Sequence, residues 1–219
     1  MNKLLLATHN PAKIRELKLG LQELKKSGIK LVTLKSLKIR SKPRETGKTF
    51  RENAVIKARY YANLSRLPTV ADDGGLSIPF LRNEPGVRSR RWLGFEASDE
   101  QLINYTLSQL KGVSLKLRRA YLETCICFYK PGYNPQGLIK NEPANPEGCV
   151  ICEQEKIHGY IAEKPCPQYA KGFPYRALLI VKKFNKYYDE LTEVEHQAIN
   201  HRLKALKRLV KKIKSNIIK

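Results

Sequence analysis

The spacing of hydrophobic and polar residues predicts an α/β chain. Short apolar runs, typical of buried strands, lie at Leu4–Ala7, Ile29–Leu34 and Ala177–Val181. Between Arg119 and Tyr129 the even-numbered residues are mostly apolar, which indicates a strand with one face toward a core. Residues 150–152 and 156–161 have the composition of a β-hairpin. Residues 131–148 contain four prolines and three asparagines without periodicity, which predicts an irregular loop or insertion.

Apolar residues at helical spacing predict four helices, each preceded by a capping residue. Asn10 suits the N-cap of the first helix, and Pro11 suits its first position. A Ser or Thr followed three residues later by Glu has the spacing of a capping box, and this pattern begins at Thr49 and again at Thr192. The predicted helices cover about residues 11–24, 49–64, 98–110 and 193–213.

The segment Pro68–Leu76 carries two adjacent carboxylates and two glycines directly after a short apolar run that suits a buried strand. Because successive side chains of a strand point to opposite faces, only one of Asp72 and Asp73 can face a given site. A carboxylate beside the bare backbone of Gly74 and Gly75 suits a divalent cation or a general base. An Asp-Gly turn is the alternative interpretation.

A strand end, a polar turn and a helix N-terminus follow one another at Thr8–Lys13. Amide groups at the start of a helix attract anions, and the ammonium group of Lys13 adds a positive charge. The segment therefore predicts a phosphate-binding turn, although it lacks the glycines of a Walker loop. An ordinary strand-to-helix turn fits the same residues equally well.

The charge is the unusual part of the composition. The 219 residues include 42 Lys and Arg against 20 Asp and Glu, a net charge of +22, whereas the hydrophobic content of 42% is ordinary. Such a charge attracts nucleic acid, acidic membrane surfaces or phosphorylated small molecules. The last predicted helix has a basic outer face, which we interpret as solvated, with a nucleic-acid-binding surface as the alternative.

Membrane insertion and secretion are not expected from this sequence. No apolar run has the length of a membrane span, and Leu4–Leu6 is too short for the core of a signal peptide. We therefore expect a cytoplasmic protein without a membrane partner.

The five cysteines, an odd number, do not suggest a disulfide framework. Four of them, Cys125, Cys127, Cys149 and Cys152, could together offer thiolates to zinc. Cys125 and Cys127 also fit the alternation of a strand, where cysteine acts as a small apolar residue, and this interpretation is favoured.

Four motifs stand in order between residues 7 and 91. They are Ala-Thr-His-Asn-x-x-Lys-x-x-Glu at 7–16, Glu-Thr-Gly-x-Thr-Phe-x-Glu-Asn-Ala at 45–54, Ala-Asp-Asp-x-Gly-Leu at 71–76 and Pro-Gly-Val-x-Ser-x-Arg at 85–91. In this combination the chain resembles the inosine triphosphate pyrophosphatase family, also called the ITP/XTP pyrophosphatases.

The resemblance implies a fold, an assembly and a reaction. The fold would be α/β, an elongated mixed β-sheet flanked by helices, with two lobes and the active-site cleft between them. The chain would form one domain over residues 1–219 and assemble as a homodimer. The reaction would be Mg²⁺-dependent hydrolysis of ITP, dITP or XTP to the nucleoside monophosphate and pyrophosphate, which removes deaminated nucleotides from the pool.

The resemblance, together with residue chemistry, also assigns roles. Glu45 and Asp73 are expected to bind Mg²⁺, which prefers one or two carboxylates with phosphate and water. Asp73 is also the expected catalytic base toward the attacking water, and Asp72 is expected to be structural. The expected substrate-binding residues are Thr8, His9, Asn10, Pro11, Ala12, Lys13, Gly74, Phe173, Pro174, Tyr175, Arg176, His196, His201 and Arg202. Among these, Phe173 and Tyr175 would stack on the base.

The second half departs from the family pattern where the base is read. Gly-Phe-Pro-Tyr-Arg at 172–176 replaces Gly-Phe-Gly-Tyr-Asp, His196 replaces a Lys, and Gly74 replaces a Ser. An arginine only donates hydrogen bonds, so Arg176 suits the C6 carbonyl of hypoxanthine or xanthine if it does not turn to solvent. We expect ITP or XTP to be preferred over ATP by a reduced margin. A nucleotide-binding protein of this fold with altered base specificity or lost turnover is the alternative.

Overall fold

The computed structural model describes residues 1–132 and 148–217, so most of the loop predicted at 131–148 lies outside the described residues. The chain divides into two compact units, which are described separately below. Unit 1 comprises Met1–Asp73, Cys125–Gln154 and Arg202–Lys219, and unit 2 comprises Gly74–Thr124 and Glu155–His201.

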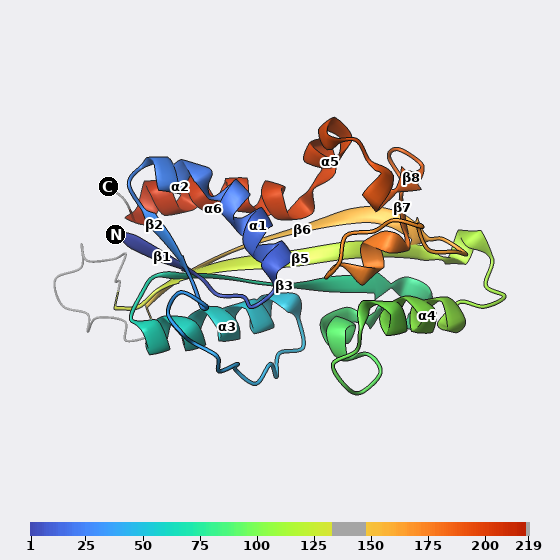
Figure 1. Cartoon of the computed structure of the whole chain (residues 1–219), viewed down its shortest axis with the longest axis horizontal. Coiled ribbons are helices and arrows are strands. Elements are labelled where there is room, and N and C mark those ends of the chain that lie inside the picture. Colours follow the sequence, from blue (N-terminus) through green and yellow to red (C-terminus); the bar gives the residue numbers. More distant parts are fainter. Residues whose placement is uncertain (133–147, 218–219) are drawn as a thin grey trace. The chain divides into compact units, whose positions relative to one another are not determined.

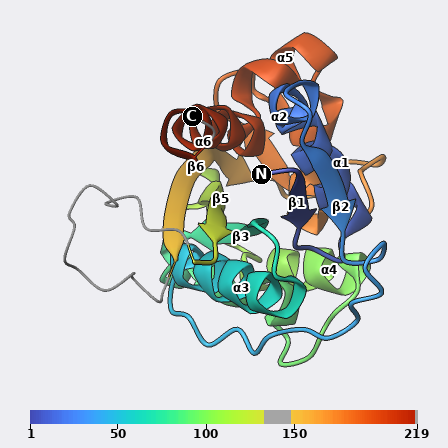
Figure 2. The same cartoon turned by 90° about the vertical axis from the view of Figure 1, so that its left-hand side faces the viewer.

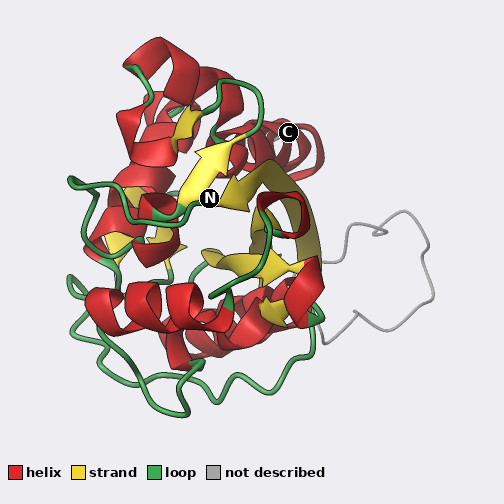
Figure 3. Ribbon diagram, turned by 90° about the vertical axis from the view of Figure 1, so that its right-hand side faces the viewer, coloured by secondary structure: helices red, strands yellow, loops and turns green. Residues whose placement is uncertain are grey.

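Eight strands form one mixed sheet in the order β2-β1-β3-β5-β6-β7-β8, with β4 paired to β3. Their bounds are β1 (Lys3–Leu6), β2 (Lys30–Thr33), β3 (Thr69–Ile78), β4 (Glu84–Pro85), β5 (Arg119–Lys130), β6 (Cys149–Ile161), β7 (Leu179–Val181) and β8 (Lys186–Tyr187). β1 runs parallel to β2 and β3, whereas the β3–β4, β6–β7 and β7–β8 pairs are antiparallel. Helices flank the strands (Figure 3), which confirms the predicted α/β class.

Six α-helices and five short 3₁₀ helices accompany the strands in the described ranges. The α-helices are α1 (Pro11–Gly20), α2 (Gln22–Lys26), α3 (Phe50–Ser65), α4 (Asp99–Gln109), α5 (Glu193–Ile199) and α6 (His201–Ile217). The 3₁₀ helices are Pro79–Leu81, Gly86–Arg91, Leu115–Leu117, Pro174–Ala177 and Tyr188–Glu190. None of these described helices is both long enough and apolar enough to span a membrane.

In unit 1 the two faces of the sheet pack against different helices. Helices α1, α2 and α6 cover one face and α3 covers the other (Figures 1 and 2). The side chains of β1 alternate between the two faces of the sheet. Leu4 and Leu6 lie in the core beneath α6, whereas Leu5 lies in the core beneath α3. Ala54 and Ala58 are completely buried, so their small side chains let α3 pack closely on the strands.

Unit 2 has a core of its own between α4, the second halves of β3 and β6 and the first half of β5. Leu76, Leu102 and Tyr188 are fully or almost fully buried in it. Arg118 is also buried there, and its guanidinium group donates to the carbonyl oxygens of Val113, Ile161, Ala162 and Leu110. A buried charge is tolerated at this position because its donors are used by backbone acceptors.

The capping residues are confirmed, with one difference in detail. The Asn10 side chain caps α1 and Pro11 occupies its first turn, while Thr192 and Glu195 form a reciprocal capping box at α5. Thr49 caps α3 by accepting from the Glu52 amide. The Glu52 carboxylate, however, accepts from the amide of Lys48, so the box is not reciprocal.

Two predicted boundaries are wrong. The alternative of an Asp-Gly turn is also excluded, because β3 continues through Gly74 and Gly75 to Ile78. The hairpin of 150–152 and 156–161 is instead the single strand β6, in which the polar side chain of Glu153 is held by ion pairs to α6. The helix predicted over 193–213 is two helices, since Asn200 leaves the helical conformation with ψ at 104°.

Candidate active site

The turn after β1 is organised by its own side chains. The amide of Asn10 donates to Thr8 Oγ1 at 3.2 Å, and Asn10 Oδ1 accepts from the amides of Ala12 at 2.8 Å and Lys13 at 3.3 Å. His9 is exposed, and its ring lies edge-on to that of Tyr61. The first amides of α1 are therefore aimed along one direction, and the Lys13 side chain emerges from the same turn.

Asp72 forms ion pairs with two basic side chains on the face of the sheet that α1 and α6 cover. Its Oδ2 atom lies 3.1 Å from Lys13 Nζ and 3.1 Å from Arg202 Nε. Arg202 also forms an ion pair with Glu16. Burial alone would raise the pKa of Asp72, but Lys13 and Arg202 outweigh it and hold that pKa well below the usual range. Asp72 is therefore a buried anion that fixes two basic side chains, as its expected structural role requires.

Asp73 points to the opposite face, toward α3. Its Oδ1 atom accepts from Lys57 Nζ at 2.7 Å, and Lys57 Nζ also lies 3.6 Å from Glu45 Oε2. Burial raises the pKa of Asp73, and the nearby cations Lys57 and Lys13 offset this only in part. The pKa of Lys57 is also raised, because the attraction of Asp73 and Glu45 exceeds the effect of its burial. Asp73, Lys57 and Glu45 thus form one partly buried charged group, which we call the Asp73 triad.

The loop that carries Glu45 is anchored to α3. The Gly47 amide donates to Asn53 Oδ1 at 2.8 Å, and Asn53 is almost fully buried. A side chain at Gly47 would have its Cβ only 2.6 Å from Asn53 Oδ1, so glycine is required for this close approach. This anchored loop therefore holds the Glu45 carboxylate next to the Lys57 ammonium group.

The geometry around Lys57 also tests whether a divalent cation fits. One ammonium group already lies within ion-pair distance of both carboxylates, so Glu45 and Asp73 converge on a single cation position. Two hard carboxylate oxygens with remaining positions for water and phosphate are the donor set that Mg²⁺ prefers. The predicted metal ligands therefore lie together, and their donor set fits such an ion, which would bind beside the Lys57 ammonium group rather than in its place.

The two glycines after Asp73 have a packing role within unit 2. A Cβ at Gly74 would lie 2.4 Å from the Glu123 carbonyl oxygen, and one at Gly75 would lie 1.9 Å from Ser89 Oγ. Ser89 Oγ in turn accepts from the Leu76 amide. Gly74 therefore allows the approach of a neighbouring strand, and its predicted contact with substrate stays a prediction.

The residues predicted to read the base lie in unit 2. The Arg176 guanidinium lies 3.6 Å from the centroid of the Phe173 ring and 4.6 Å from that of Tyr188, and Arg176 is only 6% exposed. The His196 ring meets Tyr188 edge-on at 5.1 Å. Arg176 is therefore not turned outward to solvent, which was one of the two orientations considered from the sequence. It stacks within an aromatic group of Phe173, Tyr188 and His196.

Tyr175 differs from its predicted role at the base. Its hydroxyl group donates to the Ser89 carbonyl oxygen, and its ring lies in the core of unit 2. Burial raises the pKa of Tyr175 well above its usual range. Pro174 and His201 are buried as well. Of the aromatic pair proposed to stack on a base, only Phe173 remains outside this core.

Two residues of the site were missed by sequence reasoning. Lys57 holds the Asp73 triad together, and Glu16 orients Arg202 although its motif position carried no assigned role. A signal for Lys57 was present in the sequence. It stands three residues after Ala54 and four before Tyr61, on the stripe that α3 buries, where a lysine needs an anionic partner.

Comparison with known proteins gives consistent matches over nearly the whole chain. Residues 4–212 match a model of the Ham1 family. The dITP/XTP pyrophosphatase of Bacillus subtilis (strain 168) is 36% identical over 211 residues, which cover 96% of each chain. A Ham1 protein structure from Coxiella burnetii is 31% identical, with a TM-score of 0.77 over 98% of this chain and 100% of that one. The Staphylococcus aureus Ham1 protein also has a TM-score of 0.77, at 25% identity over 97% of this chain and 98% of its own.

Proposed function

Since this chain belongs to the Ham1 family, we propose that it hydrolyses deaminated purine nucleoside triphosphates. The substrates are dITP, ITP and XTP, and the products are the nucleoside monophosphate and pyrophosphate. The relative from Bacillus subtilis bears the name of this activity, and its similarity extends over almost all of both chains. The single observation that carries the proposal is the Asp73 triad, whose two carboxylates converge on one cation position.

The mechanism assigns a separate task to each face of β3. On one face, Glu45 and Asp73 would hold Mg²⁺, which when bound neutralises phosphate charge and polarises water. Asp73 accepts a proton from the attacking water. On the other face, Asp72 holds Lys13 at the start of α1, where its ammonium group can bind a phosphate oxygen.

Lys57 has a positioning role in this scheme. Its ammonium group keeps Asp73 and Glu45 oriented toward each other, and it offsets the repulsion between two carboxylates in a buried place. Such an arrangement supplies fixed charge around the phosphates without reorganisation during the reaction.

Pyrophosphate release with Mg²⁺ tests the proposal across ITP, XTP, dITP, ATP, GTP and dUTP. We expect release from the first three, and a collapse of turnover in Asp73→Asn while nucleotide binding is partly retained. Glu163→Gln, at an exposed carboxylate, is the matched control and should keep wild-type turnover. Wild-type-like turnover of Asp73→Asn would contradict the assignment of Asp73.

A nucleotide-binding protein with changed base specificity or lost turnover is the second candidate. The observation that favours it is Arg176, which stacks on Phe173 where the resemblance led us to expect an aspartate. The same assay separates the two, because a binder would retain affinity for nucleotides and release no pyrophosphate.

We infer a homodimer, which rests on the resemblance alone, and a cytoplasmic location, which rests on the expectation from the sequence. The charge of +22 also suits nucleic acid, but part of the basic face of α6 is paired within the chain, since Arg208 and Lys212 both bind Glu153. A nucleoside triphosphate therefore remains the favoured anionic partner.

A further inference from the structure

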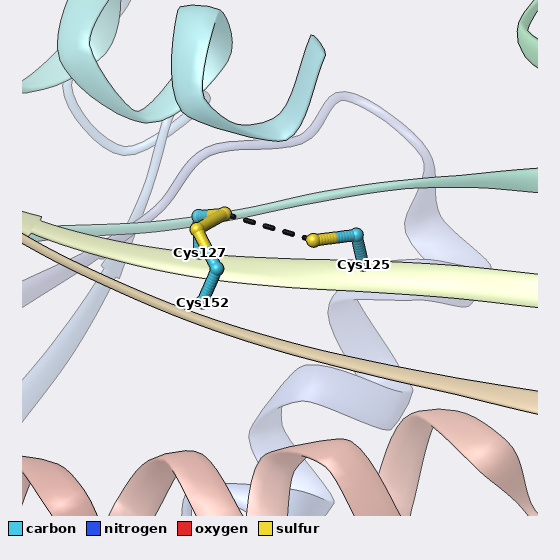
Figure 4. A group of neighbouring side chains, drawn as sticks. All are labelled: Cys125, Cys127 and Cys152. Atoms are coloured by element: carbon cyan, nitrogen blue, oxygen red, sulfur yellow. Dashed lines mark hydrogen bonds between the residues drawn. A yellow bond between two sulfur atoms is a disulfide. The ribbon is translucent and has the colours of Figure 1, made fainter. Parts of the chain in front are cut away.

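Three cysteine sulfur atoms gather on one face of unit 1. Cys125 and Cys127 lie on β5 and Cys152 lies on β6, and their Sγ atoms are all within 4.8 Å of one another. Cys127 and Cys152 form a disulfide, and Cys125 Sγ lies 3.7 Å from Cys127 Sγ (Figure 4). The cysteine count did not suggest a disulfide framework, and this one disulfide forms because β5 and β6 bring two distant cysteines face to face.

Alternation along the strands separates these three cysteines from the others. Cys152 packs with Cys125 and Cys127 in the core beneath α3, whereas Cys149 packs with Ile151 in the core beneath α6. Cys149 therefore lies on the opposite face of the sheet. The four-thiolate zinc site considered from the sequence is excluded by this arrangement, and Cys166 belongs to unit 2.

The spacing of the remaining three sulfur atoms suits a metal ion. Two thiolates that bind one Zn²⁺ at about 2.3 Å in tetrahedral geometry lie about 3.8 Å apart. The observed 3.7 Å between Cys125 and Cys127 matches this separation before any ion is added. Cys152 already faces the same point, and cleavage of its bond to Cys127 would let the two sulfurs move apart to a similar distance.

We propose that Cys125, Cys127 and Cys152 bind one Zn²⁺ ion when the Cys127–Cys152 disulfide is reduced, so that metal and disulfide exclude each other. A dithiol reductant supplies the two electrons and two protons, and is itself oxidised to a disulfide. The sulfur–sulfur bond breaks and two thiols form. Zn²⁺ then displaces the protons of all three thiols, and a water or another oxygen completes the tetrahedral coordination.

The burial of these cysteines means that metal binding must displace protons from their thiols. Cys125 and Cys127 are fully buried, and burial raises the pKa of Cys125 to about 11, so its thiol stays protonated at neutral pH without a metal. Burial outweighs the Gln154 hydrogen bond and the charge of Arg51, which favour the thiolate form of Cys125, and the charges of Asp73 and Asp72 act in the same direction as burial. Because the site must lose protons to bind Zn²⁺, its affinity should rise with pH.

Titration of the reduced protein with Co²⁺ tests this proposal, since cobalt bound to thiolates gives charge-transfer absorption that Zn²⁺ abolishes when it displaces the cobalt. We expect one equivalent per chain in the reduced protein and none in the disulfide form. Cys125→Ser and Cys152→Ser should weaken binding by about 100-fold or more. Cys149→Ser and Cys166→Ser are the matched controls and should bind like the wild type.

Two results would overturn the proposal. One is the lack of stoichiometric binding by reduced wild-type protein, and the other is a loss in Cys149→Ser as large as that in Cys125→Ser. Cys125→Ala provides a second variant with a small apolar side chain, in case the buried serine impairs folding. Circular dichroism of each variant shows whether the fold is retained, and none of these cysteines belongs to the Asp73 triad.

Discussion

Asp72 and Asp73 are neighbours in the sequence but bind different cations on opposite faces of β3. Asp72 holds Lys13 and Arg202 on the side of α1 and α6, and Asp73 holds Lys57 on the side of α3. Burial acts on both carboxylates, yet the pKa of Asp72 is lowered and that of Asp73 is raised. The reason is that two cations share one oxygen of Asp72. One strand thus carries a permanent anion and a carboxylate that is readier to take up a proton.

Asp72→Asn should destabilise the protein strongly. The variant leaves Lys13 and Arg202 close together without their common anion, in a place with little access to water. Loss of one partner from a buried ion pair costs about 3 kcal/mol or more. Urea denaturation would measure the change in the free energy of unfolding. Glu23→Gln removes an exposed carboxylate paired to Lys214 and should have little effect. Equal stability of the two variants would contradict the structural role of Asp72.

Lys57→Met should lower turnover by about 100-fold, because the variant removes the cation that orients Asp73 and Glu45. Methionine keeps most of the length of the side chain and its packing on α3. Pyrophosphate release at saturating ITP measures the effect. Lys116→Met, at an exposed position of unit 2, should leave turnover unchanged. If Lys57→Met lowered stability alone and kept turnover, Lys57 would have no part in the reaction.

Much of the fold could be predicted because it depends on local patterns. The capping residues Asn10 and Thr49 begin their helices as expected, and period-two alternation correctly sends Asp72 and Asp73 to opposite faces. The alternative of an Asp-Gly turn does not form, and the close approach that requires glycine at Gly74 is made by the carbonyl of Glu123, which lies 49 positions later in the chain. Local turn chemistry does not contain that contact.

The candidate site was predictable only in part, for the same reason. Motifs supplied Glu45, Asp73 and Lys13, but the partner of Asp73 is set by how α3 packs on β3, so Lys57 was missed. The Cys127–Cys152 disulfide likewise depends on the pairing of β5 with β6 across 25 residues. An odd number of cysteines gives no information about such a cross-strand pair.

Lys13→Ala should weaken triphosphate binding much more than nucleoside binding. Lys13 lies at the N-terminus of α1, and burial lowers its pKa while Asp72 partly restores it. Calorimetry with ITP and with inosine would separate the two affinities. Lys18→Ala on the exposed side of the same helix is the matched control. Equal losses for the two ligands would show that Lys13 does not bind phosphate.

Glu153→Gln should reduce stability near neutral pH, and this difference should shrink in acid. Burial would raise the pKa of Glu153, but hydrogen bonds from Lys212 and Arg208 outweigh it and lower the pKa below 4.5. A carboxylate with a lowered folded-state pKa stabilises the protein above its unfolded pKa, and that stabilisation is lost as the pH falls through the folded value. Melting temperatures from pH 7 down to below 4.5 would measure this.

The exposed Glu163 gives the control for that pH series. Glu163→Gln should melt close to the wild type at every pH, because the Glu163 side chain is exposed to solvent. A constant difference between Glu153→Gln and the wild type across the series would show that packing, rather than charge, explains the contribution of Glu153.

Arg176→Ala should narrow the preference for ITP over ATP. The guanidinium group lies 3.6 Å from the centroid of the Phe173 ring and 4.6 Å from that of Tyr188, so these two rings restrict its position. A hydrogen bond from a charged donor to the C6 carbonyl of hypoxanthine would be lost in the variant. Such bonds are worth about 1.5 kcal/mol or more, which corresponds to about tenfold in the ratio of kcat/KM values.

The structural role of Arg176 must be separated from base reading, since its removal also leaves two aromatic rings without their partner. A purely structural role would lower kcat/KM for ITP and ATP by the same factor and leave their ratio unchanged. Arg176→Lys keeps the charge and a donor, so it should retain more of the ratio than Arg176→Ala. Arg119→Ala, at an exposed position of the same unit, should change neither. If the unmodified protein preferred ATP, the alternative of a nucleotide-binding protein with changed base specificity would be favoured instead.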